Sequence, residues 1–97
     1  MAELLVSNRA EADLRDIWRS IAIHNPDAAD RILLGLDERL QLLRLFPRLG
    51  PVRSDIRRGL RMLVEGNYLL LYEYHGRRDE VVVVAVVDGR RELSGLF

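Results

Sequence analysis

The sequence predicts an α+β domain in which an antiparallel helical hairpin packs on a small antiparallel sheet. Apolar residues recur at helical spacing through residues 8–45. From residue 60 onwards the period changes to two, which is typical of strands. Hydrophobic residues make up 48% of the 97 residues, and no linker or low-complexity stretch interrupts them. We therefore expect residues 1–97 to form one domain around one core.

Two helices are predicted, over residues 8–24 and 26–45. Ser7 offers a hydroxyl as the N-cap of the first helix. Asn25 is a suitable N-cap for the second, with Pro26 at its first position. The connection between them is short, so the two helices should run antiparallel as a hairpin.

Two residues within these helices carry further expectations. Trp18 lies in the apolar stripe of the first helix, which places it in the core. Gly35 lies inside the second helix, where glycine costs up to about 1 kcal/mol relative to alanine. Such a glycine indicates a close approach to the first helix or to the sheet.

Four strands are predicted, three of them consecutive in the second half of the chain. They cover residues 3–6, 60–65, 68–74 and 81–87. Gly66-Asn67 suits a two-residue hairpin turn. The last strand is wholly apolar, as expected of a strand covered on both faces. We expect a three-stranded antiparallel sheet to which the N-terminal strand adds.

This sheet has more apolar surface than one helical hairpin can cover. Alternation places on one face Leu60, Met62, Val64, Val81, Val83, Ala85 and Val87. It places on the other face Leu63, Leu69, Leu71, Val82, Val84 and Val86. An apolar face left in water indicates a site for a partner protein. The alternative is that residues 46–58 and the C-terminal tail fold over it.

Arginines are the second signal of a binding surface. All fifteen basic residues are arginine, and the formal net charge is zero, which argues against nucleic-acid binding by bulk charge. Six arginines and one acid, Asp55, lie between Arg44 and Arg61. A guanidinium is a planar fork that suits carboxylates, although a solvated loop is an equally open interpretation. The candidate contacts for an acidic partner are Arg53, Arg57, Arg58 and Arg61.

Three tyrosines share one face of the predicted strand 68–74. These are Tyr68, Tyr72 and Tyr74. They belong either to a half-buried core or to a groove for a partner's side chains, and the sequence leaves both interpretations open.

Six segments in a fixed order carry a resemblance to a known family. They are Ala10–Trp18, Asn25–Arg31, Phe46–Gly50, Gly59–Arg61, Gly66–Tyr72 and Asp88–Leu93. Their order and spacing resemble the ParE branch of the RelE/ParE toxin superfamily, the toxins of bacterial toxin–antitoxin pairs. In many relatives a histidine occupies the position of Asp88. Here a carboxylate lies beside Arg90 and Arg91, so we expect an ion pair.

The resemblance implies the toxin component of a type II toxin–antitoxin system that inhibits DNA gyrase by stoichiometric trapping. It also implies neutralisation by direct binding of a ParD-like antitoxin, in a 2:2 complex or a larger multiple. Contact with DNA would be indirect, through the antitoxin. The candidate residues for binding the antitoxin or the target are Arg53, Arg57, Arg58, Arg61, Leu63, Leu69, Leu71, Tyr72, Tyr74, Arg90 and Arg91.

Catalysis is not expected from this sequence. RNA cleavage needs a base, an acid and cations for the developing phosphorane charge. RelE-like enzymes carry an arginine where this chain has Leu69, and a C-terminal tyrosine where it has Phe97. The two histidines, His24 and His75, lie in different elements without metal-ligand spacing. We predict no catalytic residue, metal or cofactor; the alternatives are a RelE-like ribosome-dependent mRNA endonuclease and a non-toxic binding module on the same fold.

Localisation follows from what the sequence lacks. No apolar run approaches the ~20 residues that span a bilayer. The N-terminus lacks the apolar segment of a signal peptide, and there is no cysteine. We expect a cytoplasmic protein without a membrane partner.

Overall fold

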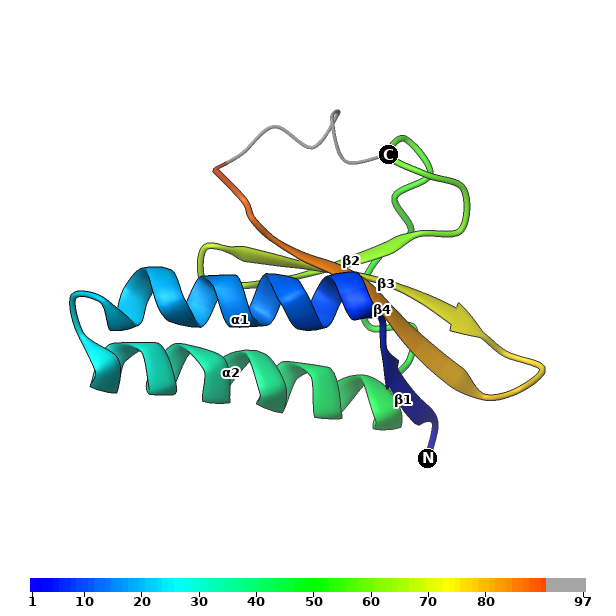
Figure 1. The fold of residues 1–97 in the computed structure, drawn as a ribbon. Coiled ribbons are helices and arrows are strands. Elements are labelled where there is room, and N and C mark those ends of the chain that lie inside the picture. The colour runs from blue at the N-terminus through cyan, green and yellow to red at the C-terminus, as the bar shows by residue number, and fades with distance from the viewer. Residues whose placement is uncertain (91–97) are drawn as a thin grey trace.

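The computed structural model describes residues 1–90, which form two helices along one face of a four-stranded sheet (Figure 1). The elements are β1 (Glu3–Val6), α1 (Asn8–Ala22), α2 (Pro26–Leu45), β2 (Arg61–Glu65), β3 (Tyr68–His75) and β4 (Glu80–Asp88). The predicted α+β class and the order of its elements are confirmed. Arg91, Phe97 and the C-terminal tail lie outside the described residues.

Both predicted helix starts are confirmed by hydrogen bonds. The Ser7 hydroxyl accepts from the Ala10 amide at 3.0 Å, and the Asn25 side chain accepts from the Ala28 amide at 3.0 Å. These side chains satisfy amides that have no partner within the first turn of a helix. The first helix ends at Ala22, two residues before the predicted position.

The sheet is mixed rather than wholly antiparallel, which corrects the prediction. Its strand order is β1-β4-β3-β2, and β1 runs parallel to β4. The amides of Glu3 and Ser7 donate to the carbonyls of Asp79 and Val83, at 2.9 and 3.0 Å. The helical hairpin lies between β1 and the rest of the sheet in the chain, so no tight turn forces β1 to run antiparallel to its neighbour.

A β-bulge in β4 changes which residues share a face. Leu71 pairs with Ala85, but Tyr72 pairs with Val83, so Val84 is an extra residue. A bulge breaks the alternation of side chains along a strand. Val81 and Val83 therefore pack toward the helices, whereas Val84, Ala85 and Val87 pack on the opposite face.

The predicted grouping of apolar residues was wrong, in part because of this bulge and in part because β2 pairs with β3 so that Met62 lies opposite Leu71 and Leu63 opposite Leu70. Leu63 packs on the helix-facing cluster, together with Leu70 and Val86. Leu69 and Leu71 share the second face with Met62 instead. On each side of the bulge, β4 residues share a face with their partners on β3: Val83 with Tyr72 before it, and Ala85 with Leu71 after it.

The second face is less open than predicted. Ile56 and Leu60, from the segment before β2, pack there against a cluster that includes Leu71 and Ala85, and Leu60, Leu71 and Ala85 are fully buried. Part of the segment 46–58 therefore folds over this face, as in the alternative interpretation of the sequence. The other part of that alternative, the C-terminal tail, lies outside the described residues. An apolar remainder is still exposed at the two sheet edges, on Leu5 and Val64.

Trp18 does not lie in the core, contrary to expectation. Its side chain is 39% exposed, and its Nε1 donates to Asp30 Oδ1 at 2.9 Å. The indole N–H needs a polar partner, and the facing helix provides one at the surface of the hairpin.

The loop after α2 is fastened to the helix-facing side of the sheet by a buried tyrosine. Tyr72 is fully buried, and its hydroxyl donates to the Pro47 carbonyl and accepts from the Gly50 amide, both at 2.8 Å. Arg61 Nη1 donates to the Gly50 carbonyl at 2.8 Å. Gly50 is buried, and a Cβ there would lie 2.7 Å from the Met62 carbonyl oxygen and 2.9 Å from Tyr72 Cε1.

We expect Gly50→Ala to lower the free energy of unfolding by about 2 kcal/mol or more, because the backbone of β2 has to move to make room. Urea denaturation followed by circular dichroism measures the change. An unfolding free energy within about 0.5 kcal/mol of wild type would contradict this packing.

Gly35→Ala is the matched control and should have the opposite sign. A Cβ at this position would meet only Glu65 Oε1, at an ordinary 3.5 Å. The gain in helix propensity should therefore appear as about 0.5–1 kcal/mol of added stability. A loss of stability in the same denaturation experiment would show that α2 and β2 are closer than this distance indicates.

Candidate protein-binding surface

The arginines predicted to meet a partner mostly hold carboxylates of their own chain. Arg53 forms a two-pronged pair with Asp55, with distances of 2.9 and 2.7 Å. This hydrogen bonding raises the pKa of Arg53 and lowers the pKa of the Asp55 carboxyl. Arg57 pairs with Glu73 of β3. The positive charge of this region is thus partly balanced inside the molecule.

Glu73 joins Arg57 to a histidine, His75, that directly follows the predicted strand 68–74. His75 is the last residue of β3, and its Nε2 lies 3.2 Å from Glu73 Oε1. Both side chains are on the face of the sheet opposite the helices, because they alternate with Tyr72 and Tyr74. Among residues 1–90, no group of His, Cys, Asp or Glu side chains is arranged to hold a metal ion.

Arg61 and Arg58 differ in whether the guanidinium group is used inside the molecule or can contact a partner. Arg61 Nη1 donates to the carbonyls of Gly50 and Arg48, at 2.8 and 3.4 Å, so it holds the loop rather than an acidic partner. Arg58 is exposed, and its side chain has no ion pair within the part of the chain that the structure describes. Of the four predicted loop arginines, Arg58 therefore offers its charge most directly.

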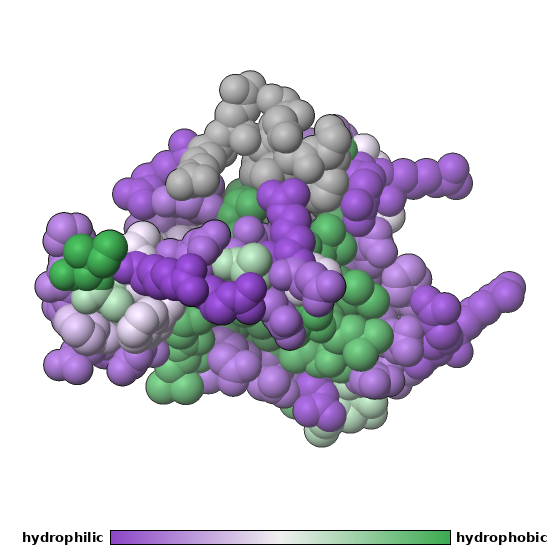
Figure 2. Space-filling model, viewed as in Figure 1, coloured by the Kyte–Doolittle hydropathy of each residue, from purple (hydrophilic) through white to green (hydrophobic). Residues whose placement is uncertain are grey.

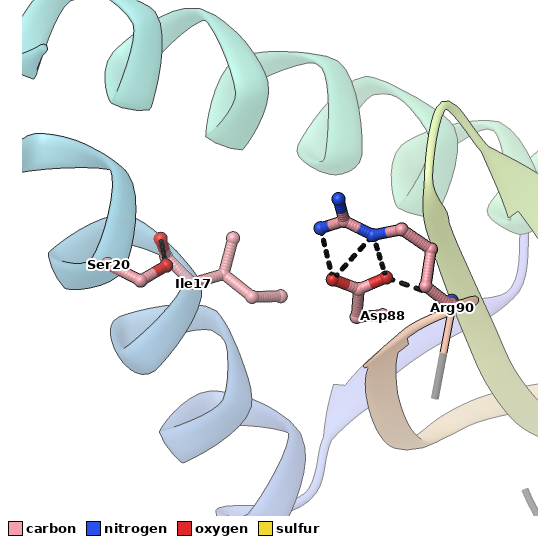
Figure 3. Close-up of polar contacts among 4 residues, drawn as sticks. All are labelled: Ile17, Ser20, Asp88 and Arg90. Atoms are coloured by element: carbon pink, nitrogen blue, oxygen red, sulfur yellow. Dashed lines mark hydrogen bonds and ion pairs between the residues drawn. The ribbon is translucent and has the colours of Figure 1, made fainter. Parts of the chain in front are cut away.

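The expected ion pair at Asp88 is present. Arg90 Nε and Nη2 both donate to the Asp88 carboxylate, which raises the pKa of Arg90. Figure 3 shows this pair on the side of the sheet that faces α1, with Ile17 pointing toward it. Arg91 lies outside the described residues.

The predicted tyrosines and leucines divide between core and surface. Tyr72 and Leu71 are fully buried, and burial raises the pKa of the Tyr72 hydroxyl. They support the surface from beneath and do not form part of it. Tyr74 is partly exposed, donates to Asp79 Oδ1 at 2.7 Å, and lies under the guanidinium of Arg48 at 4.9 Å. Leu63 and Leu69 are also partly exposed, but on opposite faces of the sheet.

The sequence analysis missed a group of exposed apolar side chains at the end of α2. We name it the 45–52 strip, and it consists of Leu45, Phe46, Leu49 and Val52, which are 57%, 58%, 43% and 50% exposed. Figure 2 shows apolar side chains gathered where the hairpin meets the sheet, while much of the hairpin surface is hydrophilic. The available signal was the set of apolar residues that directly follows the stripe of the second helix.

No helix among the described residues is both long and apolar enough to cross a membrane.

Comparison with known proteins places the chain in a family. A family model described as the ParE toxin of type II toxin-antitoxin system, parDE, matches residues 4–93. The chain is 30% identical to Toxin ParE3 of Caulobacter vibrioides over 95 residues, which are 97% of this chain and 93% of that protein.

Two solved structures share the fold. A chain of the chromosomal ParDE TA system of P. aeruginosa superimposes with a TM-score of 0.76 at 20% identity, covering 91% of this chain and 96% of that one. A chain of the toxin-antitoxin complex RelBE2 of Mycobacterium tuberculosis gives 0.64 at 26% identity, covering 90% and 96%. Family model, relative and fold agree over almost the whole chain, and the chain therefore belongs to the ParE toxin family of type II toxin–antitoxin systems.

Proposed function

We propose that this toxin inhibits DNA gyrase and that a ParD-like antitoxin neutralises it by direct binding. The observation that carries the proposal is the ParE family match over residues 4–93, together with its relative from Caulobacter vibrioides. Inhibition would be stoichiometric, in the cytoplasm, and the complex with the antitoxin would be 2:2 or a larger multiple. DNA would be reached only through the antitoxin.

The state of the arginines favours binding over turnover. Cleavage of a phosphodiester requires cations that are free to stabilise the developing charge. Arg53, Arg57 and Arg90 each hold an internal carboxylate instead. The carboxylates of a partner can compete for these guanidinium groups, because any carboxylate can accept two parallel hydrogen bonds from one guanidinium. This supports recognition of an acidic protein surface.

A second candidate function is RNA cleavage of the RelE type. Two observations favour it: the RelBE2 neighbour at 26% identity, and the grouping of Arg57, Glu73 and His75 on one face. A histidine beside a carboxylate is a side-chain combination that general acid–base catalysis uses. Against it, Leu69 on the same face provides no charge where RelE-like enzymes have an arginine. A non-toxic binding module is the third candidate.

Induced expression in a bacterial host separates the three candidates. We expect growth arrest with induction of the DNA-damage response, because trapped gyrase leaves broken DNA, and rescue by co-expressed antitoxin. Reporter fluorescence for DNA damage and primer extension on abundant messages are measured in parallel. Prompt mRNA cleavage without DNA damage would replace gyrase inhibition with the RelE-type activity, and normal growth would favour the binding module.

Arg58→Glu should weaken binding of the ParD-like antitoxin by roughly three- to tenfold at low salt, because it reverses an unpaired charge at the rim of an interface. Arg77→Glu is the matched control, since Arg77 is also exposed and also lacks an ion pair among the described residues. Titration calorimetry at two ionic strengths measures both variants, and the difference should shrink as salt screens the charge. Equal affinities for wild type and Arg58→Glu would remove Arg58 from the interface.

A further inference from the structure

The 45–52 strip concentrates apolar exposure in a short piece of chain. Ten large apolar side chains are exposed among the described residues, and four of them lie within these eight positions. Most of the others are dispersed, such as Met1 at the N-terminus and Ile23 at the tip of the hairpin. Exposed apolar side chains that gather in one place mark interaction surfaces more often than single ones do.

The backbone of the strip is attached to the sheet by several contacts. Pro47 and Gly50 are both hydrogen bonded to the buried Tyr72 hydroxyl, at 2.8 Å each. Arg61 holds the Gly50 carbonyl from the same side, and Arg48 lies over the Tyr74 ring. Pro47, Arg48 and Gly50 therefore attach the loop to the sheet. A surface that is ordered before binding loses less conformational entropy on association.

The charge around the strip selects the chemistry of an occupant. No acid occurs between Glu38 and Asp55, whereas the same segment contains four arginines. Arg44 donates to the Ala2 carbonyl and Arg48 lies over a ring, so neither is neutralised by a carboxylate in a described ion pair. The acid that follows the strip, Asp55, is held by Arg53. Asp79 is the carboxylate that comes near Arg48, and it is hydrogen bonded to the Tyr74 hydroxyl beneath it. An apolar surface beside arginines that lack an ion pair with a carboxylate fits a partner that is apolar and acidic.

We propose that the 45–52 strip is the seat of an acidic, amphipathic segment of the antitoxin, with apolar side chains against Phe46 and Leu49 and carboxylates near Arg44 and Arg48. This rests on the proposed function, because it names the surface through which neutralisation occurs. A second copy of the chain is a poorer occupant, because a two-fold contact through the strip would bring Arg44 and Arg48 of each copy together and like charges repel.

The test compares Phe46→Ser/Leu49→Ser with Ile23→Ser, using purified toxin and its ParD-like antitoxin in titration calorimetry. Both variants remove exposed apolar side chains, and Ile23 is 79% exposed, so neither should unfold the domain. Thermal melting of each free toxin checks this. We expect at least about a tenfold loss of affinity for the double variant and less than about twofold for Ile23→Ser. Raising the salt should weaken wild-type binding.

Each outcome decides the proposal. If the folded double variant bound the antitoxin as tightly as wild type does, the strip would not be the binding site, although neutralisation by the antitoxin could still hold. An equal loss with Ile23→Ser would also overturn the proposal, because the effect would not be local. No binding by wild-type toxin would overturn both this inference and the proposed antitoxin. Dimeric free toxin that becomes monomeric in the double variant, by light scattering, would assign the strip to a second copy.

Discussion

The hydroxyl of Tyr72 is the contact on which the candidate surface depends. It lies in the helix-facing core, donates to Pro47 and accepts from Gly50, and so joins the loop after α2 to the centre of β3. A buried hydroxyl without partners would cost about 1–3 kcal/mol, so the loop and the tyrosine stabilise each other. Gly50 is required in the same place, because any side chain would meet the backbone of β2. These bonds attach the loop to the sheet, and its apolar side chains Leu49 and Val52 are exposed on the surface.

The bulge at Val84 is the second constraint, and it divides the sheet between two clusters. Before it, Val81 and Val83 face the helices and β4 pairs with β1; after it, Ala85 and Val87 face the loop that carries Ile56. Beyond the end of β1, backbone groups at the edge of β4 are hydrogen bonded by side chains at the start of α1. The Asp13 carboxylate accepts from the Val86 amide at 3.0 Å, and the Ser7 hydroxyl donates to the Val84 carbonyl. The same bulge therefore positions the helical hairpin and leaves room for the second cluster.

Periodicity and capping residues were sufficient to predict the helices and the strands, because those signals are local. The family resemblance came separately, from the order and spacing of six short segments. The bulge could not be predicted, since Val81–Val87 is apolar throughout and carries no mark of a change of face. The roles of Tyr72 and Arg61 depend on contacts with residues far away in the chain. Leu45 and Phe46 directly follow the apolar stripe of the second helix in the sequence, and only the path of the loop shows that they are exposed. Of the predicted binding residues, Arg58 keeps a free charge among the described residues, while Arg53, Arg57 and Arg90 hold carboxylates.

Amide hydrogen exchange in wild type and Tyr72→Phe tests most directly whether this tyrosine holds the strip in place. The substitution keeps the buried ring and removes only the hydroxyl. We expect slow exchange of the Gly50 amide in wild type and fast exchange of the amides of residues 48–50 in the variant, with α1 and α2 unchanged. Equal protection of Gly50 in the two proteins would contradict it, because the loop would then be held by something other than the Tyr72 hydroxyl.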